Sequence, residues 1–174
     1  MITYSKHKLE NGLTLLANHD RTSRMAAVNI LYKVGARNEN PSRTGLAHLF
    51  EHLMFKGTHS VPDFDTPVQM ACGENNAFTN NDYTDFYITL PVDNIQTALW
   101  LESDRMHGLN LSEEAIEIEK RVVIEEFRQR YLNQPCYDAH APNGIYPPPL
   151  SLGNHRTFAR PYSFGFGGGD SCLL

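Results

Sequence analysis

The sequence predicts a fold that contains both antiparallel β-strands and α-helices. An Asn-Gly pair separates residues 4–9 from residues 13–18, and this pair between strand-like segments is a strong signal of a hairpin. Residues 75–90 form two further strand-like segments around a polar turn, and the second one alternates apolar and polar side chains. Residues 93–106 and 112–131 instead have the apolar spacing of helices.

The length and composition fit one ordinary soluble domain. The chain has 174 residues, of which 41% are hydrophobic and 20% are charged. A net charge of −5 argues against a general nucleic-acid binder, and no apolar run is long enough to suggest a membrane span. Residues 1–8 are polar and lack the apolar core of a secretory signal, so we expect a cytoplasmic protein. An exported protein whose signal had been removed would have the same appearance.

The segments between the hairpin and residue 75 are assigned from local composition. Residues 25–34 are apolar and rich in β-branched side chains, which predicts a third strand, and their near-continuous apolar character predicts burial on both faces. Residues 35–43 are polar and form a loop that leads to the next helix. Residues 61–72 predict a short helix that ends near Gly73.

The stretch His48-Leu-Phe-Glu51-His52 has the pattern H-x-x-E-H, and its surroundings predict a helix that Thr44 caps and Gly57 ends. Histidines four residues apart lie one turn apart on the same helix face, where they can hold one Zn²⁺. Glu51 lies on the flank of that face and is placed to take a proton from a metal-bound water. The structural alternative is a buried helix with two hydrogen-bonded histidines.

Two carboxylates of the last predicted helix differ from its other acidic residues, because they lie beside its apolar side chains. Glu119 and Glu126 are seven residues apart, so they share a helix face, and they interleave with the apolar residues Val122, Val123 and Phe127. Most carboxylates of a charged helix simply face water. An ionised carboxylate beside an apolar stripe usually has a cationic partner or a metal ion.

Three segments together resemble one family of enzymes. Residues 45–58, 75–87 and 119–128 are similar, in order and spacing, to the pitrilysin-like inverzincin metallopeptidases, which include insulysin and the mitochondrial processing peptidase. The resemblance covers residues 1–134 and implies an α+β fold, an open and mostly antiparallel sheet with helices packed on it. In the family, two such halves close around the substrate, so residues 1–134 would be an incomplete N-terminal half. Residues 135–174 do not match and predict an irregular tail.

The resemblance also implies roles for individual residues. His48 and His52 match the two zinc histidines, and Glu126 matches the third zinc ligand. Glu51 matches the general base, and Glu119 matches a carboxylate that orients a ligand. The implied activity is a zinc-dependent endopeptidase that hydrolyses peptide bonds of unstructured peptides, with weak activity expected for the incomplete half alone.

A further implication concerns peptide binding. Asn76, Ala77, Phe78 and Thr79 match the strand along which the family pairs with an extended substrate. From the residues alone, the same segment is a plain hairpin. Expected partners are therefore a peptide substrate and a second half-domain, supplied by another chain or by self-association.

Three other hypotheses are open at this point. The chain could be a non-catalytic, peptide-binding partner subunit, although such halves commonly lose the zinc residues that this chain keeps. It could be a zinc enzyme similar to S-ribosylhomocysteine lyase, which also carries H-x-x-E-H but uses a cysteine as third ligand, a position open to Cys136. The tail could also be a frame-shifted remnant, because codons for residues 151–157 can be chosen so that a one-base shift gives family-like sequence. The segments 75–87 and 119–128 favour the peptidase over the lyase.

Overall fold

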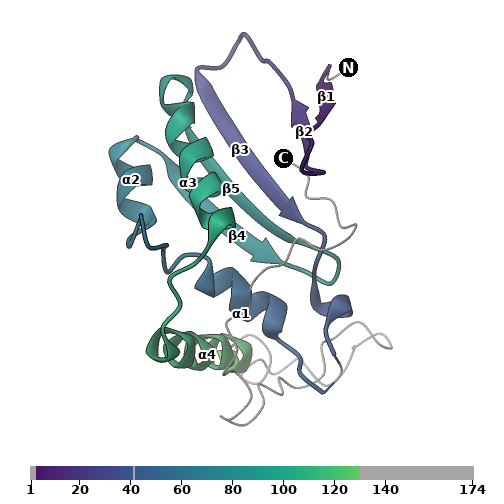
Figure 1. Ribbon diagram of the computed structural model, residues 1–174, viewed down its shortest axis with the longest axis vertical. Helices are drawn as coiled ribbons and strands as arrows, with labels where there is room; N and C mark the ends of the chain where they lie inside the picture. Colours follow the sequence, from purple (N-terminus) through teal and green to yellow (C-terminus); the bar gives the residue numbers. More distant parts are fainter. Residues whose placement is uncertain (1–2, 41, 130–174) are drawn as a thin grey trace.

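The structure is a computed structural model that describes residues 3–40 and 42–129 (Figure 1). The predicted tail, the end of the predicted family domain and Cys136 all lie outside these residues.

The described elements confirm the predicted α+β class. The strands are β1 (Ser5–Lys8), β2 (Thr14–Ala17), β3 (Met25–Tyr32), β4 (Glu74–Thr79) and β5 (Thr84–Pro91). The helices are α1 (Leu46–Leu53), α2 (Asp65–Met70), α3 (Ile95–His107) and α4 (Glu113–Phe127), with short 3-10 turns η1 (Ala36–Asn38) and η2 (Val92–Asn94). Within the described residues, every helix is too short or too polar to cross a lipid bilayer.

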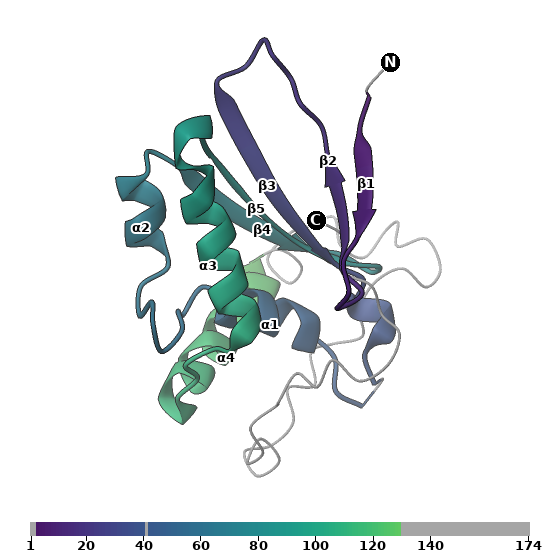
Figure 2. The ribbon, with the colours of Figure 1, turned by 45° about the horizontal axis from the view of Figure 1, so that its top comes forward.

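Both sheets are antiparallel. Strands β3, β5 and β4 form a three-stranded sheet in that order, and β1 pairs with β2 in a separate hairpin. Figure 2 shows that this hairpin stands beside β3. Because β5 lies in the centre, β4 is an edge strand of the described sheet.

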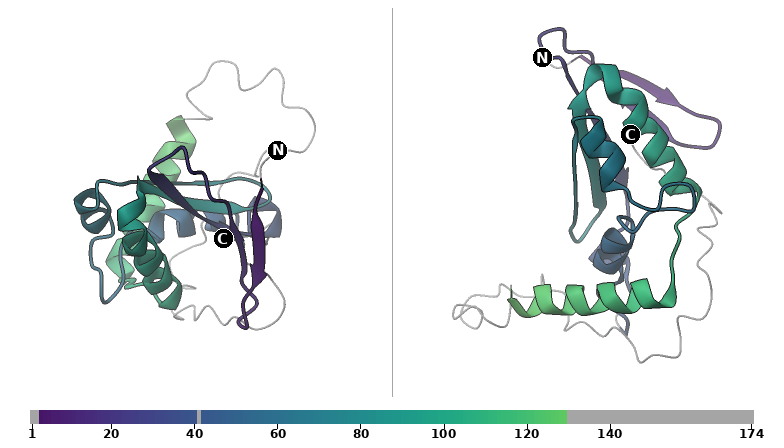
Figure 3. Two further views of the ribbon diagram at one scale, coloured as in Figure 1. Left: turned by 90° about the horizontal axis from the view of Figure 1, so that it is seen from above. Right: turned by 90° about the vertical axis from the view of Figure 1, so that its left-hand side faces the viewer.

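Helices cover one face of the three-stranded sheet. Figure 3 shows α1 at the lower end of the sheet, α4 below α1, and α2 and α3 together on one side of the sheet. The buried core between the sheet and these helices includes Phe64, Val68, Ile88, Leu90 and Leu101. The arrangement leaves the opposite face of β3, β5 and β4 without a helix among the described residues.

The one-sided cover corrects the expectation for the third strand. In β3, Val28 and Ile30 point to the core and pair with Ile88 and Phe86 of β5. Alternate positions of β3 point the other way, and Met25 is 52% exposed. The prediction of burial on both faces was wrong because an apolar run in sequence does not reveal whether a second layer covers the strand.

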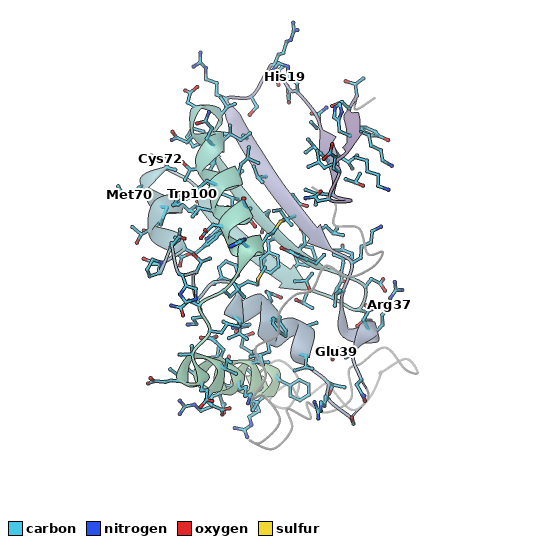
Figure 4. All side chains as sticks on the ribbon, in the orientation of Figure 1. His19, Arg37, Glu39, Met70, Cys72 and Trp100 are labelled. Carbon is cyan, nitrogen blue, oxygen red and sulfur yellow. The ribbon has the colours of Figure 1, made fainter. Side chains whose placement is uncertain are left out.

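The start of α1 differs from the prediction in its capping residue. The N-cap is Gly45, with a φ of 88°, and Thr44 is not the cap. The carboxylate of Glu39 instead accepts hydrogen bonds from the backbone N–H groups of Gly45, at 2.7 Å, and Ala47, at 2.6 Å. A negative charge at this position also suits the positive end of the helix. Figure 4 shows Glu39 in the segment that leads into α1.

Candidate metal centre

Apolar packing holds α1 against α4. Leu49 and Leu53 of α1 and Val123 of α4 form one buried cluster, in which Val123 is fully buried. His48 and His52 each precede one of these leucines, so they lie on the edge of the same interface. Packing of the apolar face of α1 therefore places both imidazoles against the surface of α4.

Three potential ligand atoms meet at this edge. His48 Nε2 lies 3.2 Å from His52 Nε2 and 3.5 Å from Glu126 Oε2. His52 Nε2 lies 3.7 Å from Glu126 Oε1. Two ligand atoms of a tetrahedral zinc ion, each about 2.0–2.2 Å from the metal, are roughly 3.4 Å apart. The three side chains are partly buried and their atoms are spaced as such a donor set requires.

Glu119 contacts the other ring nitrogen of His52. Its Oε2 lies 3.1 Å from His52 Nδ1, and the Glu119 side chain is only 7% exposed. An ionised carboxylate accepts hydrogen bonds, so Glu119 favours the tautomer of His52 that has its proton on Nδ1 and its lone pair on Nε2. This is the tautomer that a metal ligand needs.

Lys56 is part of the same cluster, and the sequence patterns did not single it out. Its Nζ lies 2.6 Å from Glu119 Oε1, so Glu119 bridges Lys56 and His52. Its spacing of four residues from His52 was the only signal in the sequence, and that signal was weak because α1 ends at Leu53 and Lys56 lies in the turn that follows.

Glu51 faces the sheet. Its Oε2 accepts a hydrogen bond from the Thr79 hydroxyl of β4 at 2.5 Å. Thr79 Oγ1 also lies 3.2 Å from Thr84 Oγ1, and the Thr84 hydroxyl donates to the Val34 carbonyl oxygen at 3.0 Å. The predicted base is therefore tied to the end of the edge strand, through a side chain that sequence analysis had placed in peptide pairing alone.

The predicted substrate strand coincides with β4. Ala77 and Thr79 lie on the face that α1 approaches, whereas Asn76 and Phe78 point to the uncovered face of the sheet. The outer edge of β4 carries no partner strand among the described residues. The structure thus brings the four predicted strand residues, the predicted base Glu51 and the three potential ligands to one end of the sheet.

A sheet edge above an H-x-x-E-H helix and a facing carboxylate helix define an inverted-zincin type of domain. The chain belongs to the insulinase family, peptidase family M16, which matches residues 14–142. The resemblance inferred from the three sequence segments is confirmed. Family membership does not favour the lyase alternative.

Individual relatives agree with this assignment. Zinc protease PqqE of Helicobacter pylori is 38% identical over 130 residues, which are 73% of this chain and 29% of that protein. The beta subunit of the mitochondrial-processing peptidase of Saccharomyces cerevisiae is 34% identical over 121 residues, which are 68% of this chain and 26% of that subunit. The chain therefore spans less than a third of the length of these two relatives.

Solved structures share the fold. The crystal structure of a protease from Helicobacter pylori matches with a TM-score of 0.74 and 35% identity, over 79% of this chain and 33% of that one. Pitrilysin matches with a TM-score of 0.67 over 74% of this chain and 14% of that one, and its 24% identity supports the fold alone.

Proposed function

We propose that this chain is the zinc-binding half of a metalloendopeptidase that hydrolyses peptide bonds in unstructured peptides. The observation that carries the proposal is the convergence of His48, His52 and Glu126, whose ligand atoms all lie within 4.8 Å of one another. Two neutral imidazoles and one carboxylate match a catalytic zinc site with an open fourth position. The relatives named as zinc proteases support the choice of metal.

The chemistry follows from the roles of the chain's own residues. Zinc bound by the three side chains would supply a Lewis acid that activates water and polarises a peptide carbonyl. Glu51 would accept a proton from the attacking water and return it to the amine that leaves when the C–N bond breaks. Its hydrogen bond from Thr79 holds the carboxylate on the side of the substrate strand. Glu119 would keep His52 in the ligating tautomer.

The edge strand β4 would bind the substrate. An extended peptide can add to an exposed edge through backbone hydrogen bonds, with side chains making secondary contacts. Pairing along Asn76, Ala77, Phe78 and Thr79 would carry the peptide toward Glu51, because Thr79 contacts that carboxylate. The substrate class is therefore peptides whose backbone can become extended and whose N–H and C=O groups are not already paired within a stable fold.

The chain retains the proposed base Glu51 and all three proposed zinc ligands, which supports a catalytic role over a purely binding one. A non-catalytic partner subunit would need the sheet edge, but neither a base nor three ligands. The remaining contacts to the substrate would come from a second half-domain. Because relatives are much longer, that half could lie on a longer chain or on a second one.

Removing one ligand tests the site. We expect the purified chain to bind about one zinc per molecule, and we expect His48→Ala, His52→Ala and Glu126→Ala each to weaken binding strongly, because three protein ligands leave no redundancy. Metal analysis after dialysis measures this. Glu125→Ala is a matched control, because Glu125 is an exposed neighbour that pairs with Arg128 instead. Unchanged zinc content in Glu126→Ala would contradict the ligand assignment.

A further inference from the structure

We propose that Lys56 is a positioning residue of the metal centre, which acts on His52 through Glu119. The inference rests on the proposed zinc site and adds a residue that neither the sequence patterns nor the family comparison assigned. It concerns the affinity for the metal, so it can be tested without any peptidase activity.

The contacts form a linear relay. Lys56 Nζ lies 2.6 Å from Glu119 Oε1, and Glu119 Oε2 lies 3.1 Å from His52 Nδ1. Each carboxylate oxygen therefore has its own hydrogen-bond donor. With both oxygens engaged, rotation of the carboxylate would break one contact, so Lys56 fixes the direction in which Oε2 points.

Burial makes the cation important to Glu119. The Glu119 side chain is 7% exposed, whereas that of Lys56 is 40% exposed. A carboxylate withdrawn from water needs charged or hydrogen-bonding partners to stay in place. Lys56 brings its charged Nζ to the buried carboxylate, although its side chain as a whole is only partly withdrawn from solvent. Without it, the preference of Glu119 for its inward position would weaken.

The local backbone explains why Lys56 occupies this place. After α1 the chain makes a tight turn, in which the Phe55 and Lys56 N–H groups donate to the carbonyls of His52 and Leu53 at 3.2 and 3.1 Å. Gly57 then adopts a φ of 88°, and any Cβ there would collide with the backbone of Val61. The hydrogen bonds before Lys56 and the close packing of Gly57 after it thus fix the turn, and Lys56 points toward Glu119 of α4.

The expected size of the effect follows from its distance to the metal. Loss of a group that directly contacts a ligating histidine typically costs about 10- to 100-fold in metal affinity. Lys56 acts one contact further out, so we expect Lys56→Met to weaken zinc binding by about 3- to 10-fold. Lys56→Arg keeps the charge and can donate to the same carboxylate, so it should stay within about 2-fold of the parent chain.

The experiment is a double-mutant cycle on the full 174-residue chain. Zinc affinity is measured by competition with a chromophoric chelator for the parent, Lys56→Met, Glu119→Gln and the double variant. The relay predicts that Lys56→Met has little further effect once Glu119 is changed, because the two residues act in series. Lys6→Met is the matched control, because Lys6 is an exposed lysine of β1 that lies outside the cluster.

Each outcome has a distinct meaning. Unchanged affinity in Lys56→Met, or an equal loss in the presence and absence of Glu119, would overturn the inference. A parent chain whose zinc binding does not depend on His48, His52 and Glu126 would instead overturn the proposed function. Thermal unfolding of the metal-free variants reports on the fold. If Lys56→Met lowers the unfolding temperature, the cycle is repeated with Lys56→Gln, and recovery by Lys56→Arg still separates a lost relay from lost structure.

Discussion

The polar residues of the H-x-x-E-H motif contact two parts of the fold, because both histidines lie against α4 and Glu51 lies against β4. His48 faces Glu126, His52 lies between Glu126 and Glu119, and Glu51 turns to Thr79 of β4. Residues 48 and 52 share one helix face and residue 51 lies on its flank, where it reaches Thr79 of β4 and not Glu126 of α4. Separate substitutions should therefore abolish metal binding and proton transfer independently of each other.

We expect Glu51→Gln to retain zinc and to lose hydrolysis. The amide is nearly isosteric and can still hydrogen-bond to Thr79, but it cannot accept a proton from the attacking water. Zinc content and peptide turnover are measured on the same preparations, for the chain alone and with any partner half. Glu125→Gln, on the exposed side of α4, is the control. Turnover in Glu51→Gln comparable to the parent would mean that Glu51 is not the base.

The sequence predicted the members of this cluster better than their contacts. Spacing alone placed His48 and His52 on one helix face and Glu119 and Glu126 on a face of another helix, and the family resemblance supplied their individual roles. The contacts of Glu51 with Thr79 and of Glu119 with Lys56 depend on how α1 meets β4 and α4. Local periodicity contains no information about such tertiary contacts, so they could be found only in the folded chain.

At the scale of the elements, the α1–α4 interface determines whether the ligands meet. Two of the potential ligands come from α1 and one comes from α4. Residues 54–112 separate these two helices along the chain, so only tertiary packing brings the ligands together. The boundaries of these helices were predicted to within a few residues, but the capping of α1 by Glu39 was not, because Glu39 lies several residues before the helix. Nor could an apolar run reveal that β3 is covered on one face only.

Val123→Ala should weaken folding and zinc binding together. Val123 is fully buried against Leu49 and Leu53, so truncation leaves a cavity and costs roughly 1–3 kcal/mol of unfolding free energy. The same cavity loosens the position of Glu126 relative to α1. Val122→Ala is the adjacent control, because Val122 is 39% exposed and should change either quantity little. Denaturant unfolding and chelator competition measure the two effects, and equal behaviour of the two variants would contradict this account.

Helix α3 contains an ion pair whose burial affects the pH dependence of stability. Burial raises the pKa of Glu102 above its usual value, although the adjacent Arg105 opposes that shift. The Arg105 guanidinium in turn lies 4.4 Å from the ring centres of both Phe64 and Phe86. Because the pKa of Glu102 is higher in the folded state, the folded chain binds the proton more tightly than the unfolded chain does.

The stabilisation linked to that proton is fully present below the unfolded pKa of Glu102 and is lost as pH rises through the folded pKa. We therefore expect the unfolding free energy of the parent chain to increase, relative to that of Glu102→Gln, as the pH falls from neutral toward the pKa of an ordinary carboxyl group. Urea unfolding at several pH values measures the difference. A difference that does not change with pH, or that shrinks on acidification, would contradict the assigned direction.

At the scale of the whole molecule, the described part of the chain leaves much apolar surface uncovered. Large hydrophobic side chains are exposed on several elements, and the most exposed of them include Met25 of β3, Met70 of α2, and Trp100 of α3, beside Leu99 of the same helix. Figure 4 shows Met70 and Trp100 on the helical side of the molecule. A groove of about 960 Å³ also lies between the hairpin, α1 and α3, with Leu13, Met54 and Trp100 among its lining residues.

We expect this surface to promote self-association of the 174-residue chain. Exposed apolar patches of this kind mark surfaces that other polypeptide normally covers. Sedimentation velocity over a range of concentrations should show a dimer or larger species. Trp100→Gln together with Leu99→Gln should shift the distribution toward monomer, whereas Val122→Gln on α4 serves as a distant control. A concentration-independent monomer would contradict the prediction.

The zinc-loaded chain should nevertheless be a poor peptidase by itself. Positioning of reactants accounts for as much as about 7–11 kcal/mol of an enzymatic barrier, and β4 can hold a peptide from one side only. Each missing donor to the developing oxyanion costs about 3 kcal/mol more, and the described residues place only the three potential metal ligands, Glu51 and β4 at this end of the sheet. Turnover of a generic fluorogenic peptide by the zinc-loaded monomer should therefore be slow or undetectable, and a complementary half-domain should raise it. Rates of about 1–10³ per second from the monomer, abolished by Glu51→Gln, would show that this half is sufficient.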